Sequence, residues 1–517
     1  MAPMLPPATI DDDACYRALC AHDARFDGRF FTAVTSTGIY CRPVCRVRTP
    51  RRENCRFFEH AAQAERAGFR PCLRCRPELA PLERHWSTED ASTILVQQAT
   101  RWLDDPLNWA DPDVSAAMSE RLANRLGVSD RHLRRVFEEH LGVSPLQYLQ
   151  TRKLLTAKQL LADTDLPVTQ VAMASGFASV RRFNAAFLGH YRLNPTQLRR
   201  QAPTRKGSDT GQGTSVRLGY RPPYDVHALL AFLRQRLITG TGFVRAEAGA
   251  PLQLGQTCRL PAATGSVHAG WLLVDFDEAR CQVVLRVSDS LREALPQVIH
   301  RVRAALDLDA DPAAINAVLH GAFPEGDGLR VPGAVDGFEL AVRAVLGQQI
   351  TVAAARTLSQ RLVDRFGEAI DTPFLELTRL FPAHEVLAQA GGDALGQLGI
   401  VKQRQAAIVS LAQAVAGQRL QLHGSADVPA TIAALKELPG IGDWTAQYIA
   451  MRALRWPDAF PAGDVALQKV MGVQHHKQAA RLAEAASTVW KPWRSYAVIR
   501  AWAAGVAPST ESKGTPT

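Results

Sequence analysis

Leu438-Pro-Gly-Ile-Gly-Asp-Trp444 lies between two segments with helical character, residues 431–437 and 445–455. Two glycines around one apolar residue predict a tight hairpin that can approach a partner closely, because neither glycine carries a Cβ atom. Backbone amides at the start of the second helix would then face outward and attract an anion such as a DNA phosphate. The alternative is an ordinary connection between two helices.

A carboxylate and several aromatic residues accompany this hairpin. Asp464 precedes an apolar run, where it is either a helix N-cap or a group that acts on a sugar, and one residue can do both. Trp444 and Tyr448 are four residues apart and share one helical face, and Trp502 follows. These rings belong either to a plain core or to a pocket that stacks a flipped, electron-poor base.

Together these residues resemble the helix-hairpin-helix DNA glycosylases, specifically the alkylbase (AlkA-like) branch. The resemblance implies that Asp464 is the catalytic carboxylate. It also implies a base pocket and a DNA-binding hairpin, formed by Trp444, Tyr448, Trp502, Gly440 and Gly442.

Two further positions follow from the same resemblance. Residues 338–355 resemble the family helix whose end supplies the side chain that fills the duplex when a base is flipped. The AlkA pattern has an apolar residue there, whereas this chain has Gln349. Strand-cutting relatives carry a lysine where this chain has Thr445 and Ala446, so the resemblance implies a monofunctional enzyme.

Seven of the nine cysteines fall before residue 80, and four of them form two pairs. The pairs are Cys41 with Cys45 and Cys72 with Cys75. In a reducing compartment this spacing predicts one tetrahedral zinc site of four thiolates. A run of arginines that includes Arg42 and Arg46 surrounds the pairs and predicts contact with DNA. The alternative is a structural zinc module with a solvated basic rim.

Thr37-Gly-Ile-Tyr-Cys-Arg-Pro-Val-Cys-Arg46 and Gly68-Phe-Arg-Pro-Cys-Leu-Arg-Cys-Arg-Pro77 resemble the N-terminal domain of the Ada alkylation-response proteins. That resemblance implies that Cys41 accepts a methyl group from a DNA phosphotriester, a choice that spacing alone leaves open among the four cysteines. Ada proteins also carry a second methyltransferase with a Pro-Cys-His-Arg motif. The motif is absent from this sequence, so we expect no repair of O6-alkylguanine.

Two similar helical units follow, at residues 122–137 and 168–184. Each has a short helix, a glycine turn and a second helix that begins after a serine, which predicts a pair of helix-turn-helix units. Their second helices carry arginines that we expect to contact DNA: Arg134, Arg135, Arg181 and Arg182. The pair resembles the AraC-type regulators, and its combination with a zinc module resembles the Ada arrangement.

We therefore expect a multidomain, mainly α protein. Its predicted parts are a small α+β Ada-like zinc domain (1–86), an all-α AraC-type double helix-turn-helix domain (87–200), a flexible linker (201–214), an α+β domain like the AlkA N-terminal domain (215–328), an all-α helix-hairpin-helix glycosylase domain (329–506) and a disordered tail (507–517). We interpret the linker as a flexible tether between the regulator-like first half and the glycosylase-like second half. Residues 215–325 show no catalytic constellation.

The net charge of +10 favours an acidic partner, here double-stranded DNA as damaged sites and promoters. RNA polymerase is a further expected partner. The sequence has no run that would span a membrane, so we expect a cytoplasmic, nucleoid-associated monomer of bacterial type. One zinc ion is the expected cofactor. No cysteine follows Cys281, which argues against an iron–sulfur cluster.

These features predict a methylphosphotriester-sensing transcriptional regulator joined to a DNA glycosylase that excises alkylated bases such as 3-methyladenine. Two alternatives stay open. In one, a DNA-binding transcription regulator carries a catalytically weak glycosylase-like domain. In the other, a repair enzyme uses its first two hundred residues only for localisation, with zinc as a structural staple.

Overall fold

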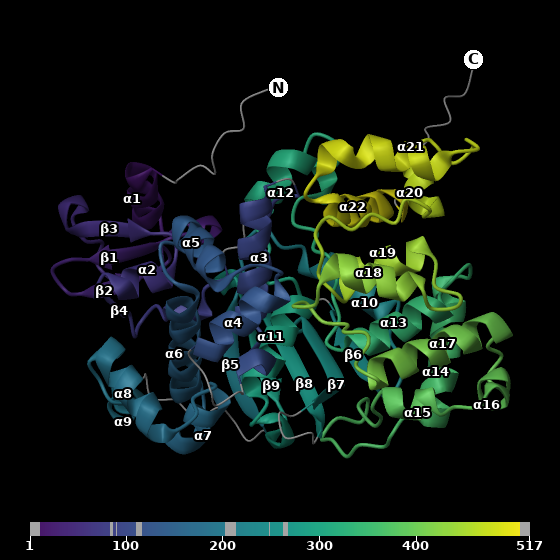
Figure 1. Cartoon of the computed structure of the whole chain (residues 1–517), viewed down its shortest axis with the longest axis horizontal. Coiled ribbons are helices and arrows are strands. Elements are labelled where there is room, and N and C mark those ends of the chain that lie inside the picture. The colour runs from purple at the N-terminus through teal and green to yellow at the C-terminus, as the bar shows by residue number, and fades with distance from the viewer. Residues whose placement is uncertain are drawn as a thin grey trace.

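The computed structural model describes residues 11–82, 86–88, 90–109, 116–201, 213–247, 249–261 and 267–506. Four groups of elements follow one another along the chain and pack side by side (Figure 1). The predicted fold class, multidomain and mainly α with small sheets, is confirmed. The expected tail and nearly all of the expected linker lie outside the described residues.

Residues 11–82 form the small α+β domain. Its sheet has the order β3-β1-β2-β4, in which β1 pairs antiparallel with β2 and β3 while β2 pairs parallel with β4. The elements are α1 Asp12–Cys20, β1 Phe31–Val34, β2 Ile39–Cys41, β3 Cys55–Phe58, α2 Ala61–Arg66 and β4 Arg70–Pro71. Ala33 and Tyr40 are cross-strand partners in its core. Because side chains alternate along a strand, the next residue, Cys41, points to the other face.

Residues 90–109 and 116–201 form the double helix-turn-helix domain. Its helices are α3 Ala91–Leu103, α4 Ala116–Arg125, α5 Asp130–Leu141, α6 Pro145–Asp163, α7 Val168–Ala174, α8 Val180–Tyr191 and α9 Pro195–Gln201. The turns contain Gly127 and Gly176, at φ of +68° and +75°, where a Cβ atom would be strained. Ser129 and Ser179 cap α5 and α8, each accepting a backbone N–H three residues on, as their sequence positions predict.

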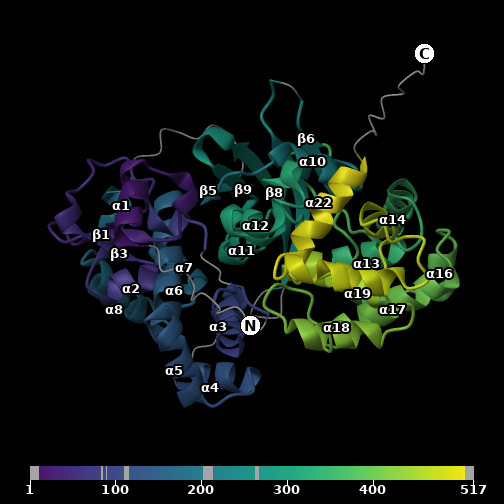
Figure 2. The same ribbon diagram turned by 90° about the horizontal axis from the view of Figure 1, so that it is seen from above.

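The third group surrounds an antiparallel sheet of order β5-β9-β8-β7-β6. Its elements are β5 Thr214–Gly219, α10 Val226–Arg234, β6 Gly242–Arg245, β7 Gln253–Pro261, β8 Val267–Asp277, β9 Gln282–Val287, α11 Leu295–Ala305 and α12 Pro312–Leu319. In the view from above, α11 and α12 lie against this sheet (Figure 2).

The last group is helical and holds the hairpin. Its helices are α13 Gly337–Leu346, α14 Val352–Phe366, α15 His384–Ala388, α16 Gly392–Gly396, α17 Lys402–Ala416, α18 Val428–Lys436, α19 Asp443–Arg452, α20 Val465–Val470, α21 Ala479–Ala486 and α22 Arg494–Val506. Helices α13, α17, α19 and α22 contribute to one large core, which includes Leu346, Leu411, Ile449 and Val498. The expected hairpin between residues 437 and 445 is therefore anchored in a continuous core.

The two halves of the chain are packed together, which differs from the tethered arrangement that the linker suggested. One hydrophobic cluster contains Phe183 and Phe187 of α8 together with Val216 and Leu218 of β5. Nearer the hairpin domain, Trp86 stands edge-on to Trp456 at a centroid distance of 5.7 Å, and the Ser425 hydroxyl donates to Asp105 at 2.7 Å. Linker composition reports on chain flexibility but not on the surfaces that the linker brings together.

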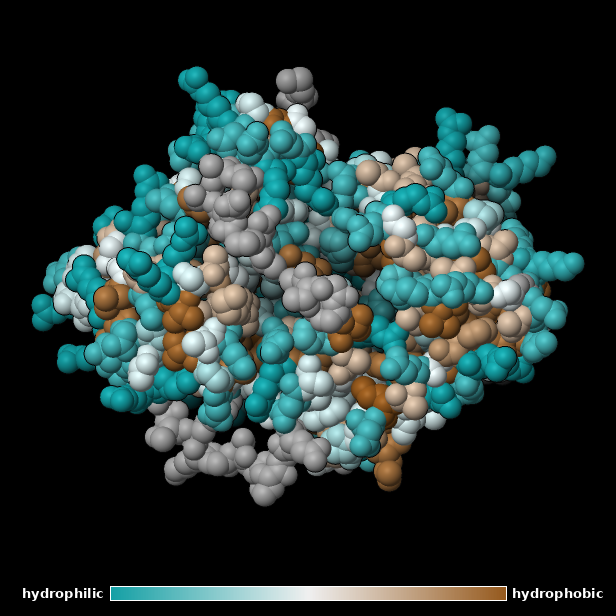
Figure 3. Space-filling model, turned by 60° about the horizontal axis from the view of Figure 1, so that its bottom comes forward, coloured by the Kyte–Doolittle hydropathy of each residue, from teal (hydrophilic) through white to brown (hydrophobic). Residues whose placement is uncertain are grey.

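The surface is largely hydrophilic on the face that Figure 3 shows, and hydrophobic residues appear there in separate groups between hydrophilic ones. Among the described helices, none combines the length and apolar character that crossing a bilayer requires.

Phe187 tests the shared core. Its side chain is fully buried and packs against Phe183 and Tyr191, at centroid distances of 5.3 and 4.7 Å. Phe187→Ala should lower the free energy of unfolding by about 3–5 kcal/mol, measured by urea denaturation of the full chain. The neighbouring Leu188 is 53% exposed, so Leu188→Ala should cost less than about 0.5 kcal/mol. Equal losses for the two variants would contradict this packing.

Candidate active site and zinc cluster

The hairpin between α18 and α19 has the geometry that its glycines predict. Gly440 has φ +76°, and a Cβ atom there would stand 3.3 Å from the Gln403 carbonyl oxygen and from Ala407 Cβ. Gly442 is the N-cap of α19 and offers no side chain to the first amides of that helix. These amides are therefore available to an anion from outside.

Asp464 is the N-cap of α20 and receives three N–H donors. Its Oδ1 accepts the backbone N–H of Leu467 at 2.8 Å and the indole N–H of Trp502 at 3.1 Å. Its Oδ2 accepts the indole N–H of Trp444 at 3.0 Å. Asp464 can therefore cap α20 and still present its carboxylate beside the two indole rings. Two large side chains from α19 and α22 fix the carboxylate in place.

Side-chain amides hold the loop that leads to Asp464. Gln447 of α19 accepts the Phe460 N–H at 3.2 Å, and Gln468 of α20 donates to the Ala462 carbonyl at 2.8 Å. The carboxylate is consequently positioned from both helices that flank its loop.

The three predicted pocket rings lie together beside this carboxylate. Trp444 and Tyr448 are stacked, with a centroid distance of 5.2 Å and an interplanar angle of 16°. The Tyr448 and Trp502 centroids are 6.2 Å apart at an angle of 38°. Asp464 and all three rings line one cavity of about 1010 Å³. Its size and aromatic wall suit a flipped base.

Residues from outside the helical domain also line this cavity, and the sequence analysis missed them. Helix α10 contributes Phe232, the segment just after α10 contributes Arg236, and α19 adds Arg452. The Arg236 guanidinium carbon lies 3.6 Å from the Phe232 ring centroid, and that of Arg452 lies 4.9 Å from it. Phe232 lies in α10 and Arg236 lies two residues after its end, and their four-residue spacing was the available indication.

Charges near the cavity alter the acidity of its phenol. Burial raises the pKa of the Tyr448 hydroxyl, but the positive charges of Arg452 and Arg236 outweigh burial and leave that pKa below its ordinary value. Arg452 donates from Nη1 to the Tyr448 oxygen. Burial lowers the pKa of Arg236 to about 10 and also lowers the pKa of Arg452. Arg236 and Arg452 therefore place positive charge beside Tyr448 in the cavity wall.

Gln349 projects from the turn between α13 and α14. It is exposed and has φ +53°, a left-handed backbone conformation that residues other than glycine rarely adopt. The amide of the preceding Gln348 donates to the Gly440 carbonyl and to Thr445 Oγ1, both at 2.9 Å. The turn that carries Gln349 is thus bound directly to the hairpin.

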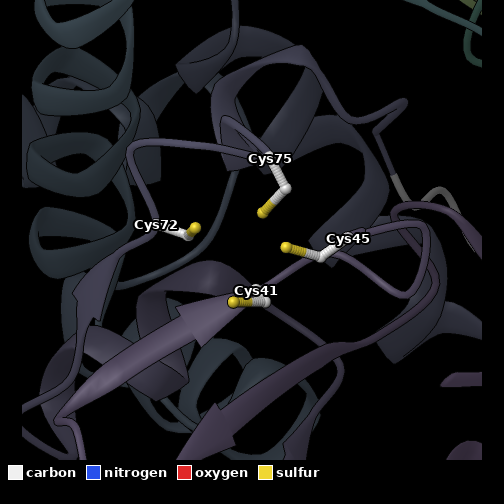
Figure 4. Close-up of side chains that lie close together, drawn as sticks. All are labelled: Cys41, Cys45, Cys72 and Cys75. Carbon is white, nitrogen blue, oxygen red and sulfur yellow. The ribbon is translucent and has the colours of Figure 1, made fainter. Parts of the chain in front are cut away.

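Cys41, Cys45, Cys72 and Cys75 converge, and their sulfur atoms point toward a common centre (Figure 4). All four lie within 4.8 Å of one another. Four thiolates at 2.3 Å from a tetrahedral zinc ion would be about 3.8 Å apart, so a small contraction brings this set to zinc geometry. Backbone N–H groups of Arg42 and Arg74 donate to Cys75 Sγ and Cys72 Sγ at 3.4 Å. The donor set therefore fits zinc.

The two predicted DNA-binding arginines of this domain differ in their surroundings. Arg46 is exposed, as a phosphate contact requires. The Arg42 side chain is only 11% exposed and its guanidinium pairs with the buried Asp27 carboxylate. Its position after a cysteine gave no indication of this partner fifteen residues earlier in the chain. The pairing with Asp27 holds the Arg42 side chain inside the domain, and a DNA contact by Arg42 stays a prediction.

The helix-turn-helix arginines Arg134, Arg135, Arg181 and Arg182 are exposed on α5 and α8. Arg134 and Arg135 contact acidic residues one helical turn away, Asp130 at 3.4 Å and Glu139 at 3.3 Å. Exposed pairs of this kind contribute little and can give way to a phosphate.

Profiles of four known families match the chain in succession. They are the metal binding domain of Ada at residues 14–78, a helix-turn-helix domain at 122–201, the AlkA N-terminal domain at 215–336 and the HhH-GPD superfamily base excision DNA repair protein at 342–495.

Individual relatives show the same composite character. The chain is 38% identical over 504 residues to a probable bifunctional transcriptional activator/DNA repair enzyme AlkA of Mycobacterium tuberculosis, covering 95% of this chain and 96% of that protein. It is 32% identical over 286 residues to DNA-3-methyladenine glycosylase 2 of Escherichia coli, covering 55% and 95% respectively. With the bifunctional transcriptional activator/DNA repair enzyme AdaA of Bacillus subtilis it shares 29% identity over 196 residues, covering 38% and 86%.

The first similarity extends over nearly the full length of both proteins, and the four family profiles occur in the same chain. This chain therefore belongs to the family of bifunctional transcriptional activator/DNA repair enzymes that join Ada-type zinc-binding and helix-turn-helix domains to an AlkA-type DNA glycosylase.

Proposed function

We propose that this protein senses methylphosphotriesters through Cys41, regulates transcription through its helix-turn-helix pair and excises alkylated bases such as 3-methyladenine with Asp464. A regulator half and a DNA glycosylase half are present in one chain. The observation that carries the proposal is the Asp464 carboxylate, held by two indole N–H groups beside an aromatic cavity and an open helix N-terminus.

In the excision step the bond between C1′ of the sugar and the base nitrogen breaks. The electron pair leaves with the base and neutralises its positive charge, so the base needs little help from an acid. Positive charge develops on the sugar instead. Asp464 stabilises that charge and orients the water that attacks C1′, while Trp444, Tyr448 and Trp502 stack on the extruded base.

The same geometry supports roles for the hairpin and for Gln349. Amides after Gly440 and Gly442 would hold a phosphate beside the lesion, and Gln349 would enter the space that the flipped base leaves. Thr445, in place of a lysine, accepts a hydrogen bond from Gln348. This arrangement supports an enzyme that removes the base without cutting the strand, because forming an imine with the sugar would need a lysine amine at the position of Thr445.

In the sensing step the Cys41 thiolate attacks the methyl carbon of a phosphotriester. The carbon–oxygen bond breaks, its electron pair stays on the phosphate oxygen, and a thioether forms at Cys41. A zinc ion bound by the four cysteines supplies the charge that keeps the thiols deprotonated at neutral pH. The proposal includes this single zinc ion and no iron–sulfur cluster.

The proposed partners follow from these roles. Damaged duplexes and promoters would bind at the hairpin and at α5 and α8. An activator also needs RNA polymerase, and we propose that the chain acts on it as a monomer. Association with the nucleoid follows because both halves bind DNA.

Asp464→Asn should bind lesion-containing duplex normally but release base at least about a hundredfold more slowly, because it removes a charge that matters chiefly in the transition state. The measurement is single-turnover release of free base from methylated DNA. Asp393→Asn, the same change at an exposed residue of α16, is the matched control and should behave as wild type. Near-wild-type release by Asp464→Asn would remove Asp464 from the catalytic role.

The aromatic wall should select bases by charge rather than by one hydrogen-bonding edge. Rates of release for a panel of duplexes should be highest for cationic bases such as 3-methyladenine and lower for neutral mismatched bases. If neutral bases are released as fast as cationic ones, the rings do not act as a cation-recognising pocket.

Methylation of Cys41 should strengthen promoter binding. Four thiolates around a dication carry a net charge of −2, and a thioether at Cys41 leaves −1. The cluster then repels DNA phosphates less, so it offsets less of their attraction to the exposed Arg46 and Arg48. Each additional phosphate that the protein neutralises steepens the dependence of log affinity on log salt by about one unit. The test is promoter affinity against salt for unmethylated and Cys41-methylated protein, with Cys41→Ala as a control for loss of charge alone. Equal affinities and slopes would mean that the zinc cluster is structural.

A further inference from the structure

Arg221 is the centre of a buried contact between the two halves of the chain. It follows β5 and its side chain is completely buried. Its Nε donates to the Asp27 carbonyl at 2.8 Å, and its Nη2 donates to the Leu82 carbonyl at 3.1 Å, both in the regulator half. Its Nη1 donates to the Asp309 carbonyl at 3.1 Å in the glycosylase half. One guanidinium therefore holds backbone from both halves.

The chemistry of the guanidinium suits this task. Its five N–H donors lie in a fixed plane, so a single side chain can satisfy several carbonyls in one rigid arrangement. Removing it would leave those buried carbonyls without their donors, which is more costly than losing an exposed contact.

Further contacts surround Arg221. The backbone N–H of Leu82 donates to the Asp309 carboxylate at 2.9 Å, and Arg303 donates from Nε to the same carboxylate at 3.0 Å. Arg29 pairs with Asp311 across the same boundary. Asp309 thus accepts from Arg221 through its carbonyl and from Leu82 of the regulator half through its carboxylate. Both halves therefore supply donors to this contact.

Asp27 connects this contact to the cysteine cluster. Its carbonyl holds Arg221, while its carboxylate, buried at 3% exposure for the residue, accepts Arg42 Nε at 2.8 Å. Arg42 Nη1 donates to the Cys75 carbonyl at 3.1 Å, and the Arg42 backbone N–H donates to Cys75 Sγ at 3.4 Å. Only two residues, Arg42 and Asp27, therefore separate a cysteine of the cluster from Arg221.

The turn after Asp27 packs closely against Pro81. Gly28 has φ +76°, and a Cβ atom there would lie 2.0 Å from the Pro81 carbonyl oxygen. Any side chain at this position would push the turn away from Pro81 and from Arg221.

We propose that this surface of the regulator half is a docking site whose partner is the glycosylase half of the same chain. Arg221 clamps the two halves into one body, and the Arg42–Asp27 pair beside the cysteine cluster orients the carbonyl that Arg221 holds. The proposal goes beyond sensing and excision as separate activities and depends on neither.

The first test asks whether the halves stay together without a covalent link. A protease site is inserted between residues 202 and 212 of the full chain, the zinc-loaded protein is cleaved in its native state, and the fragments are separated by gel filtration at about micromolar concentration. Co-elution is expected for wild type and for Arg259→Ala, which breaks an ion pair with Glu368 inside the glycosylase half. Cleaved Arg221→Ala should separate. Separation of the wild-type fragments, or undiminished co-elution of Arg221→Ala, would overturn the clamp.

The second test keeps the chain intact and Arg221 in place. Asp27→Asn retains the carbonyl but weakens the pairing with Arg42, so the Leu82 amide should exchange its hydrogen at least about tenfold faster in zinc-loaded protein. Asp23→Asn, on the same segment, affects an ion pair with the exposed Arg25 and should leave that rate unchanged. Equal Leu82 exchange in wild type and Asp27→Asn would overturn the connection between the cysteine cluster and the docking site.

Discussion

Three N–H donors hold the carboxylate of Asp464 in one position, and its proposed action on a sugar depends on that position. The donors come from the start of α20 and from the indoles of Trp444 and Trp502. The two indole rings that line the cavity therefore also fix the carboxylate beside it. Replacing either indole would disturb the base pocket and the carboxylate together.

The sequence predicted this constellation because its parts depend on local rules. Glycines at a turn, a capping aspartate and rings four residues apart on a helix are determined by spacing along the chain. The family resemblance assigned them roles, and the cysteine cluster was predictable for the same reason, since Cys41, Cys45, Cys72 and Cys75 have zinc-binding spacing. Long-range assembly then brought these local features together around large cores.

Contacts between distant segments were not predictable. Arg42 stands in a basic run that favours DNA contact, yet Asp27 holds it in a buried pair. Phe232 of α10 and Arg236, just after that helix, line the same cavity as Asp464, which lies far later in the chain. The contacts of Arg221 likewise join segments that are far apart in the sequence. Each outcome depends on which surfaces meet, and residue spacing within one segment contains no information on that.

The central claim is that Asp464 is complementary to positive charge at C1′. The most direct measurement compares the affinity of the full chain for two duplexes with abasic-site analogues, one with a cationic pyrrolidine nitrogen at the C1′ position and one with a neutral tetrahydrofuran. Because enzymes bind analogues of the transition state more tightly, wild type should prefer the cationic duplex by at least about a hundredfold, and Asp464→Asn should lose most of that preference. Equal affinity of wild type for both duplexes would contradict the account.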